Sequence, residues 1–473
     1  MTTAPQSPIA RLTARQGSIR SLLARTTALD VWAFVVPATS FVQARIIGEL
    51  ILSEVLALLL LPWLLRSRDR LRAPKSLLVL LGAWLVSQIA SDLIVRSAVR
   101  DWTRGWAAIG FTLIDLLAFL TLASTAARAR IVAFGLAAGG VLGVLIDPTS
   151  FELSDPWKYA IGGAIGLVLA AGLSGASAAR RPWVAIAIFG SFGMVNAAIF
   201  GFRSMSGVAL LTAAYLILAT VLRHRKPLGQ RFPARIAVGV GFYGIAALVI
   251  YLGLSAAAAA NVFGDAARAK FDAQAGIVVP SGPPQASNSQ APAVSQVPSA
   301  TTVPAASIAP ANPLGVLAGG RAELLASTQA ILDSPILGHG SWARDPKYVQ
   351  LQRQRLIDLG IPGGNLPADP DLIPTHSYLL GSWVWAGLAG GLFWGAVAVL
   401  VLWMLANVYW SGLELNPLIA FVASTLLWSI AFSPYSNTER LYATFGIVVC
   451  LLALRLIRSQ DQPGRWSVEP ASA

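Results

Sequence analysis

The sequence is poor in charge, cysteine and histidine, and each shortage excludes a class of protein. Charged residues make up 12 % of the 473 positions, whereas a soluble domain usually carries about 25 %. The single cysteine, Cys450, cannot form an intrachain disulfide. With three histidines and one cysteine, the chain has too few good ligands for a structural zinc site. It has no Walker loop, which excludes an energy-coupling ATPase within this chain. It also has no Gly-x-Ser-x-Gly nucleophile elbow.

Apolar residues, by contrast, make up 55 % of the chain. The charges are clustered, and the runs between them are about 17–25 residues long, enough for helices to cross about 30 Å of hydrocarbon. This pattern predicts an all-α, polytopic membrane protein with about twelve transmembrane helices and a long periplasmic loop that contains short helices. The spans are expected near 29–44, 47–65, 76–95, 106–125, 131–147, 158–178, 183–201, 207–222, 236–257, 377–407, 416–433 and 440–457.

The distribution of basic residues predicts the orientation. Twenty-one lysines and arginines flank one side of the expected spans. Seven are counted with the short loops of the other side: Arg45, Arg96, Arg100, Arg104, Lys158, Arg203 and Arg440. Cytoplasmic loops are enriched in lysine and arginine, so both termini should be cytoplasmic and no nucleic-acid partner is expected for the net charge of +13. The expected parts are a cytoplasmic tail 1–28, spans one to nine 29–257, a periplasmic loop 258–376, spans ten to twelve 377–457, and a cytoplasmic tail 458–473.

The long loop divides by composition. Residues 273–313 are rich in Ala, Pro and Ser and carry neither charge nor aromatic side chains, so we predict disorder there. Residues 314–376 should form a small helical subdomain. Apolar side chains recur at helical spacing from Arg321 to Leu332, and a second helix is expected from Lys347 to Leu359.

Three residues near the outer face could carry chemistry. An arginine at the membrane boundary can bind a pyrophosphate bidentately, and Arg203 and Arg321 are candidates for this. The alternative for Arg203 is a snorkelling interfacial arginine, and for Arg321 a solvated charge at a helix end. His376, at the beginning of the tenth span, has a side chain suited to general-base catalysis, or it could anchor the helix at the interface. His339, between two glycines, reads mainly as a turn residue.

Several carboxylates are further candidates for a functional role. The Asp369-Pro370-Asp371 stretch has the outline of a metal-binding Asp-x-Asp pair, but its proline favours a solvated turn. Glu54 and Asp115 fall inside predicted spans, where acidic side chains are functional candidates by default, and Glu49 could reach the interface.

Short motifs in the second half of the chain occur in a recognisable order: Arg203-Ser204 to Gly207, Gly320 to Leu324, Asp333 to Gly340, His376 to Leu379, and Trp385 to Gly390. With the twelve-span layout, they resemble the O-antigen ligase and Wzy-type O-antigen polymerase superfamily of bacterial envelope polysaccharide assembly. The likeness covers about 200–390 in motifs and most of the chain in topology. The family's common His-Asn-Ser-Tyr reads Thr-His-Ser-Tyr here, without the asparagine.

The resemblance implies an inverting glycosyltransferase of the inner membrane that needs no metal and no cofactor. Its donor would be an undecaprenyl-pyrophosphate-linked glycan, and its acceptor a glycan, lipid A–core or another hydroxyl. By the same resemblance, Arg203 and Arg321 would hold the pyrophosphate and His376 would be the catalytic base, with His339 and Tyr378 as secondary site residues. Ligase, exopolysaccharide or O-antigen polymerase, and protein oligosaccharyltransferase all stay open. Two other classes also do: a flippase of lipid-linked sugars and a non-catalytic assembly partner.

Overall fold

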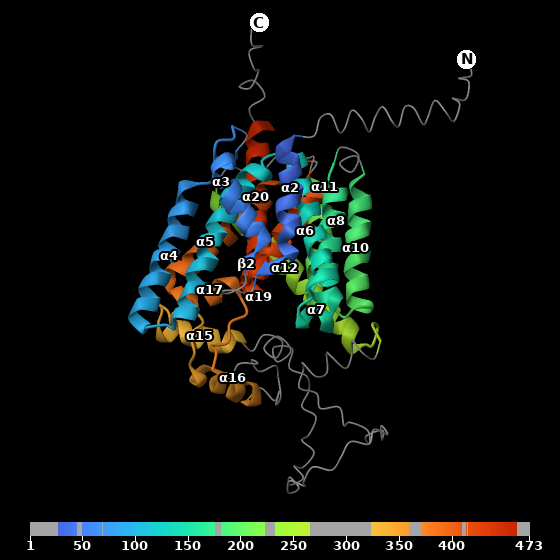
Figure 1. Cartoon of the computed structure of the whole chain (residues 1–473). Coiled ribbons are helices and arrows are strands. Elements are labelled where there is room, and N and C mark those ends of the chain that lie inside the picture. The colour runs from blue at the N-terminus through green and yellow to red at the C-terminus, as the bar shows by residue number, and fades with distance from the viewer. Residues whose placement is uncertain are drawn as a thin grey trace, which may run out of the picture.

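The computed structural model describes residues 27–44, 50–68, 70–175, 181–222, 232–264, 323–358, 371–408, 413 and 415–460. These residues form a bundle of helices (Figure 1), as the sequence predicts. The helices are α2 (Ala28–Ala38), α3 (Leu52–Leu65), α4 (Lys75–Val95), α5 (Val99–Leu122), α6 (Ala126–Ile146), α7 (Ser150–Ser154), α8 (Gly162–Gly172), α10 (Pro182–Ala198), α11 (Arg203–Leu222), α12 (Phe232–Ala259), α15 (Glu323–Asp333), α16 (Pro346–Asp358), α17 (Tyr378–Ala386), α18 (Leu388–Val408), α19 (Asn416–Phe432) and α20 (Asn437–Gln460).

Seven of these helices, α4, α5, α6, α11, α12, α18 and α20, are long and apolar enough to cross a membrane. Five shorter apolar helical stretches of 10–17 residues accompany them among the described residues. Their outward faces carry large hydrophobic side chains, for example Leu59 at 70 % and Val79 at 68 % exposure, which suits contact with lipid rather than water. The chain is therefore a multi-pass helical membrane protein.

The first two predicted spans, 29–44 and 47–65, form shorter helices than predicted. Helix α2 is followed by a 3-10 turn, η1 (Thr39–Phe41), and an antiparallel pair of short strands, β1 (Gln43–Ala44) and β2 (Leu50–Ile51), leads into α3. One cause is the side chain of Glu54, which accepts a hydrogen bond from the Ile51 backbone N–H at 3.3 Å and so fixes the first turn of α3.

The predicted tenth span, 377–407, is in fact two helices. Helices α17 and α18 meet at Gly387, whose φ of +65° lies in the region that favours glycine. The backbone of Ile336 packs directly on this break: its carbonyl oxygen accepts a hydrogen bond from the Leu388 N–H at 3.1 Å. A glycine in an apolar run is compatible with a continuous helix, so the sequence pattern did not reveal the break.

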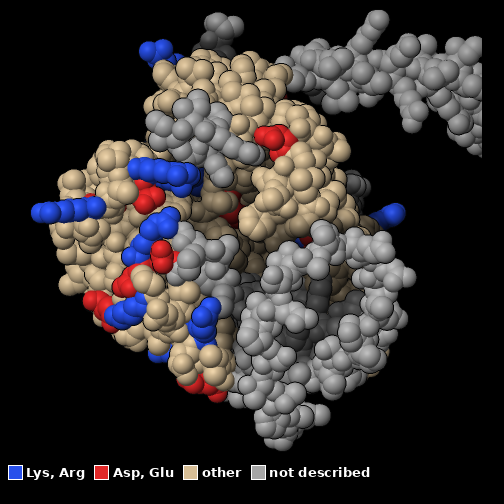
Figure 2. All heavy atoms as spheres, turned by 60° about the horizontal axis from the view of Figure 1, so that its bottom comes forward, with Lys and Arg blue, Asp and Glu red and all other residues tan. Residues whose placement is uncertain are grey.

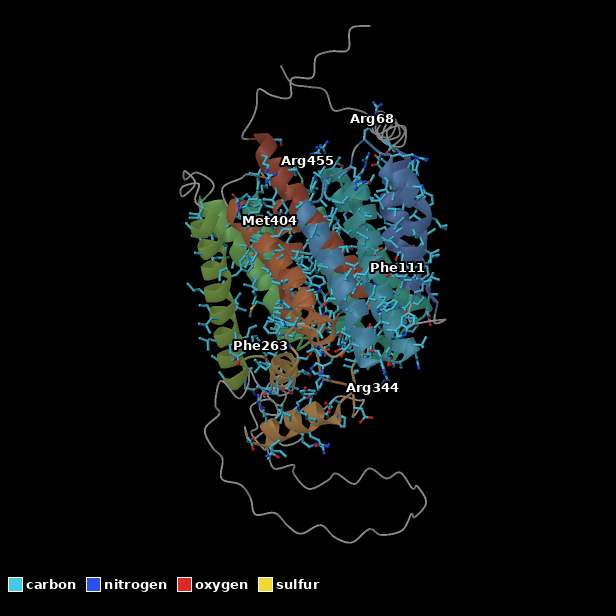
Figure 3. All side chains as sticks on the ribbon, turned by 90° about the vertical axis from the view of Figure 1, so that its left-hand side faces the viewer. Arg68, Phe111, Phe263, Arg344, Met404 and Arg455 are labelled. Carbon is cyan, nitrogen blue, oxygen red and sulfur yellow. The ribbon has the colours of Figure 1, made fainter. Side chains whose placement is uncertain are left out.

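The two ends of the bundle differ in the helices that lie there. Helix α2 begins and α20 ends at one end, whereas α15 and α16 lie at the opposite end, which we call the α15–α16 end (Figure 1). Figure 3 likewise shows Arg68 and Arg455 at one end and Arg344 at the other. Helix α12 stands at the edge of the bundle, and only 11 % of its apolar window is buried.

Helices α15 and α16 lie on the two stretches for which helices were predicted, 321–332 and 347–359. Asp333, at the end of α15, joins them by accepting hydrogen bonds from Lys347 Nζ at 2.7 Å and from the Tyr348 hydroxyl at 2.8 Å. Figure 2 shows lysine and arginine side chains gathered at this end of the molecule, interspersed with acidic ones. Arg344, Lys347 and Arg353 are among the exposed residues here.

Candidate functional site

The segment that carries His376 is fixed on both sides. Before it, the Ser327 hydroxyl of α15 donates a hydrogen bond to the Pro374 carbonyl oxygen at 2.6 Å. After it, the Ser377 hydroxyl donates to the Ile430 carbonyl oxygen of α19 at 2.7 Å and accepts from the Leu380 N–H, which makes Ser377 the N-cap of α17. His376 itself is half-buried between these two anchors. Its backbone is thus held in place, as a catalytic side chain requires.

Tyr378 begins α17, two residues after His376, and is 1 % exposed. Its hydroxyl donates a hydrogen bond to Glu439 Oε2 in the first turn of α20. Its ring contacts Trp394 and Tyr435, with ring centroids 4.9 and 5.0 Å away. The hydrogen bond to a carboxylate and the packed ring fix the position of the phenol.

A cavity of about 50 Å³ lies beside Tyr378, in the core of the bundle. Its lining is mostly apolar and comes from five helices, α8, α11, α17, α19 and α20. The lining includes Gly163, Met205, Tyr378, Phe421, Ser429 and Tyr442. At roughly 10–15 Å³ for each water-sized probe, it has room for a few apolar groups rather than for a whole lipid chain.

Met205 brings the start of α11 to the same cavity. Helix α11 begins at Arg203, after a turn in which Gly201 has a φ of +58° and the Phe202 N–H donates to the Asn196 carbonyl oxygen at 2.9 Å. Met205 and Tyr378 each lie two residues beyond a predicted site residue, Arg203 and His376 respectively. Residues near the beginnings of α11 and α17 therefore line the same cavity.

The side chains of the two arginines predicted to bind pyrophosphate are not part of the described structure. The side chain of Arg203 and the whole of Arg321 lie outside what the structure describes. So do Asp369 and the predicted disordered tract 273–313, whereas Asp371 is described and exposed.

His339 is held away from this cavity, as part of a turn. Its Nε2 lies 2.8 Å from the Ala330 carbonyl oxygen, and its backbone N–H donates to the Val384 carbonyl oxygen at 2.7 Å. Its ring meets the Tyr348 ring edge-on, with centroids 5.5 Å apart. Since it is not among the residues that line the cavity, its contacts describe a structural link between α15, α16 and α17.

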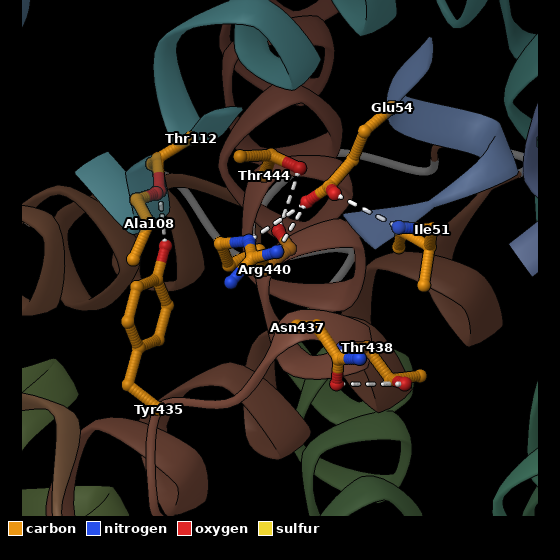
Figure 4. Close-up of polar contacts among 9 residues, drawn as sticks. All are labelled: Ile51, Glu54, Ala108, Thr112, Tyr435, Asn437, Thr438, Arg440 and Thr444. Carbon is orange, nitrogen blue, oxygen red and sulfur yellow. Dashed lines mark hydrogen bonds and ion pairs between the residues drawn. The ribbon is translucent and has the colours of Figure 1, made fainter. Parts of the chain in front are cut away.

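A second polar cluster lies inside the bundle and includes a residue that we had assigned to a short outer loop, Arg440. The structure corrects this: Arg440 is 8 % exposed, and its Nε and Nη2 lie 2.8 and 2.6 Å from Glu54 Oε1 (Figure 4). Asp115 is also buried, at 1 % exposure, as predicted for an acid inside a span, and Glu49 lies outside the described residues.

Sequence reasoning missed the importance of Glu439 and Arg440, which follow each other at the start of α20. Glu439 reaches Tyr378 beside the cavity, whereas Arg440 reaches Glu54 in the core. The available signal was an acid and a base at the beginning of an otherwise apolar span, in Asn437-Thr438-Glu439-Arg440. Charged side chains at such positions are costly unless paired, which marks them as candidates. No protein-family model, curated protein or solved structure matches the chain.

Proposed function

We propose that this protein is a membrane glycosyltransferase that transfers or polymerises an undecaprenyl-pyrophosphate-linked glycan on the periplasmic face of the inner membrane. In this proposal, twelve spans cross the membrane, both termini are cytoplasmic and the loop 258–376 is periplasmic. The arrangement of the ends supports it, because α15 and α16 lie opposite the beginning of α2 and the end of α20. The basic residues support the same orientation.

One observation carries the proposal: Met205 and Tyr378 line a single, mostly apolar cavity next to the backbone positions of Arg203 and His376. A lipid-linked donor needs an apolar surface for its carrier, a cation for its pyrophosphate and a base for the acceptor. Residues of these three kinds begin α11 and α17 or immediately precede them. An enzyme of this class requires such residues close to one another, and helices hold them more accurately than loops do.

The proposed reaction is a direct displacement at the anomeric carbon. His376 takes the proton from the acceptor hydroxyl as its oxygen forms the new glycosidic bond. The bond between the anomeric carbon and the pyrophosphate oxygen breaks, and the electron pair leaves with the carrier pyrophosphate. Arg203 and Arg321 stabilise the negative charge that grows on this leaving group as the bond breaks. They favour the transition state over the bound donor because part of this charge has already developed in the transition state. The displacement inverts the configuration of the sugar.

The test uses purified protein, an undecaprenyl-pyrophosphate glycan, and either lipid A–core or a second molecule of the donor as acceptor. We expect product with wild type and none with His376→Ala. Gly163→Leu tests the cavity separately, because a Cβ at Gly163 meets only Met205 Cε, at 3.9 Å, and a larger side chain extends into the cavity. The matched control is Gly172→Leu on the same helix, where a Cβ has no atom within 4 Å.

We expect Gly163→Leu to lose activity and Gly172→Leu to keep it, with both proteins folded. One added glycan block would identify a ligase and a ladder a polymerase. Full activity of His376→Ala would overturn the assignment of the base, and full activity of Gly163→Leu would show that the cavity is not part of the site.

A specific observation also favours a second candidate, a flippase of lipid-linked sugars. Such transporters use paired ionisable groups inside the membrane. The Glu54–Arg440 pair with Asp115 beside it has this character. Transfer of a labelled donor across liposome membranes, with no acceptor present, distinguishes the flippase from the enzyme. A non-catalytic assembly partner would show neither activity and would tolerate His376→Ala.

A further inference from the structure

Asp115 is a carboxyl group in the core of the bundle. It lies on α5, is 1 % exposed, and neither of its carboxylate oxygens has a hydrogen-bond partner among the described residues. An ionised carboxylate in this position is strongly unfavourable, because burial removes its hydration and no donor replaces the lost water. By contrast, Asp92, another buried acid of the bundle, accepts hydrogen bonds from five donors.

The charged groups around Asp115 do not balance if every group is ionised. Two charged side chains interact electrostatically with it, Glu54 of α3 and Arg440 of α20. Tyr435, just before α20, is the third titratable neighbour and is hydrogen-bonded to Thr112 at 2.5 Å. Among the described residues, the other helices packed against α5 add no charged group that interacts with Asp115. Within this cluster, two carboxylates and one guanidinium leave one negative charge.

We propose that Asp115 binds a proton, so that Asp115, Glu54 and Arg440 together form a neutral proton-binding site inside the bundle. The geometry assigns the proton to Asp115 rather than to Glu54. Glu54 accepts one hydrogen bond from Arg440 Nε and one from the Ile51 N–H, and it forms an ion pair with Arg440 Nη2 at 2.6 Å; all three contacts stabilise its ionised form. Asp115 has no such donors in the part of the chain that the structure describes.

A metal cation fits the site less well than a proton does. The guanidinium of Arg440 repels a second cation, and its pairing with Glu54 occupies the carboxylate that a metal would need. Within the described parts of the chain, no histidine, cysteine or further acid joins Glu54 and Asp115 to complete a set of metal ligands. A proton needs only one of the two free oxygens of Asp115.

The site is linked to the cavity by consecutive residues of α20. Loss of the proton from Asp115 adds a negative charge that competes with Glu54 for Arg440. Arg440 is the neighbour in sequence of Glu439, which accepts the hydrogen bond from Tyr378 at the cavity. Proton binding at Asp115 is thus positioned to affect the group that fixes Tyr378, whether the cavity serves transfer or transport.

Infrared spectroscopy of the purified protein in lipid nanodiscs tests the proposal directly. A protonated carboxylic acid gives a C=O stretching band above the amide I region, which shifts when its proton is exchanged for deuterium. We expect one such band in wild type at neutral pH, lost in Asp115→Asn and retained in the matched variant Asp101→Asn at the half-buried start of α5. Spectra in sodium and in choline buffers should be the same.

Each other outcome overturns the proposal. If wild type has no band at neutral pH, or if the band persists in Asp115→Asn, Asp115 is not the proton carrier. If sodium removes the band, the site binds a cation in place of a proton. The absence of a wild-type band and its removal by sodium are both measured on wild type, so they do not depend on the folding of Asp115→Asn. If Asp115→Asn does not fold, Asp115→Glu replaces it, and a band that is lost or shifted to a new frequency in that variant assigns the band to Asp115.

Discussion

Asp92 accepts hydrogen bonds from both the backbone N–H and the hydroxyl of Ser341, at 2.6 and 2.7 Å, although 249 residues separate the two in sequence. The same carboxylate accepts from Trp106 Nε1 at 2.9 Å and from Gln88 Nε2 at 3.2 Å. Asp92 is 2 % exposed. It therefore ties the segment after His339 to α4 and α5 through a fully hydrogen-bonded charge.

Replacement of Asp92 by alanine should strongly destabilise the protein. Removing the carboxylate leaves several buried donors unpaired, and each such donor costs about 1–3 kcal/mol. We expect a total loss of about 2–4 kcal/mol, since neighbouring groups relax. Thermal unfolding followed by tryptophan fluorescence measures it, with Asp101→Ala at the same end of the bundle as control. Equal unfolding temperatures for the two variants would contradict the role given to Asp92.

The break at Gly387 should tolerate no side chain. Its φ is +65°, and a Cβ there would overlap the carbonyl oxygen of Ile336, which is backbone and cannot rotate away. We expect Gly387→Ala to cost at least about 1–3 kcal/mol and to lower the unfolding temperature. Gly395→Ala, in the same helix pair with no atom within 4 Å of the new Cβ, should instead be neutral or stabilise by about 0.5–1 kcal/mol. A Gly387→Ala protein as stable as Gly395→Ala would show that the break is not required.

These two positions also show how far the sequence could be interpreted. Apolar runs predict where helices lie, and the positions of α15 and α16 agree with prediction because their apolar residues recur at helical spacing. The division at Gly387 was not predictable, because it depends on the backbone of Ile336 packing against it. A local sequence pattern describes one helix at a time and does not predict which segments pack against it.

The candidate site shows the same limit. His376 and Arg203 were predicted from their chemistry and their positions at helix starts, but Glu439 was not, because its partner Tyr378 is brought to it only by the fold. Arg440 was counted with a loop because it stands at the edge of a predicted span. Its pairing with Glu54 was not predicted, because Glu54 lies 386 residues earlier in the chain. Pairing across such distances in sequence is invisible to periodicity and composition.

The junction of α15 and α16 should respond to pH at both extremes. The hydrogen bond from Lys347, followed by those from Gln329 and Tyr348, lowers the pKa of Asp333 well below its usual value. A lowered folded-state pKa gives stabilisation that is fully present above the unfolded value, about 3.9, and is lost as the pH falls towards the folded value. The hydrogen bond to Asp333 raises the pKa of Lys347, so its contribution is present at neutral pH and is lost above the usual lysine range.

Hydrogen-exchange protection of α15 and α16, corrected for the intrinsic exchange rate, measures this dependence. We expect constant protection between about pH 5 and pH 9 and a decline below about pH 4. Asp333→Asn should lower the plateau and abolish the acid decline. The control is Asp358→Asn on the exposed end of α16, whose carboxylate accepts a hydrogen bond from Gln354 in the same helix. An acid decline unchanged in Asp333→Asn would assign it to another group.

Removal of the Tyr378 hydroxyl should reduce function more than stability. Tyr378→Phe keeps the ring contacts with Trp394 and Tyr435 but removes the hydrogen bond to Glu439. Hydrogen bonds to charged groups contribute about 1.5–3 kcal/mol, so we expect about a 10–100-fold fall in glycosyl transfer if this bond positions the site. Tyr243→Phe, which removes a buried hydroxyl bonded to Ser424 at 3.3 Å, is the matched control. Equal activity of the two variants would exclude the Tyr378 hydroxyl from the reaction.

The Glu54–Arg440 pair should behave as a unit. Glu54→Gln removes the only charge that Arg440 contacts within 4 Å among the described residues, and it leaves the buried guanidinium without a compensating charge unless Asp115 first loses its proton. Breaking a buried pair from one side typically costs about 3–5 kcal/mol, so we expect a large fall in the unfolding temperature. Arg440→Gln should be similarly unstable, because it leaves Glu54 and Asp115 without a cation.

The double variant Glu54→Gln with Arg440→Gln removes both charges, and it should recover most of the loss because two amides of similar volume can hydrogen-bond to each other. A double-mutant cycle of unfolding temperatures measures this coupling. If the two single losses simply add, the pair is not coupled, and the charge balance that assigns the proton to Asp115 loses its basis.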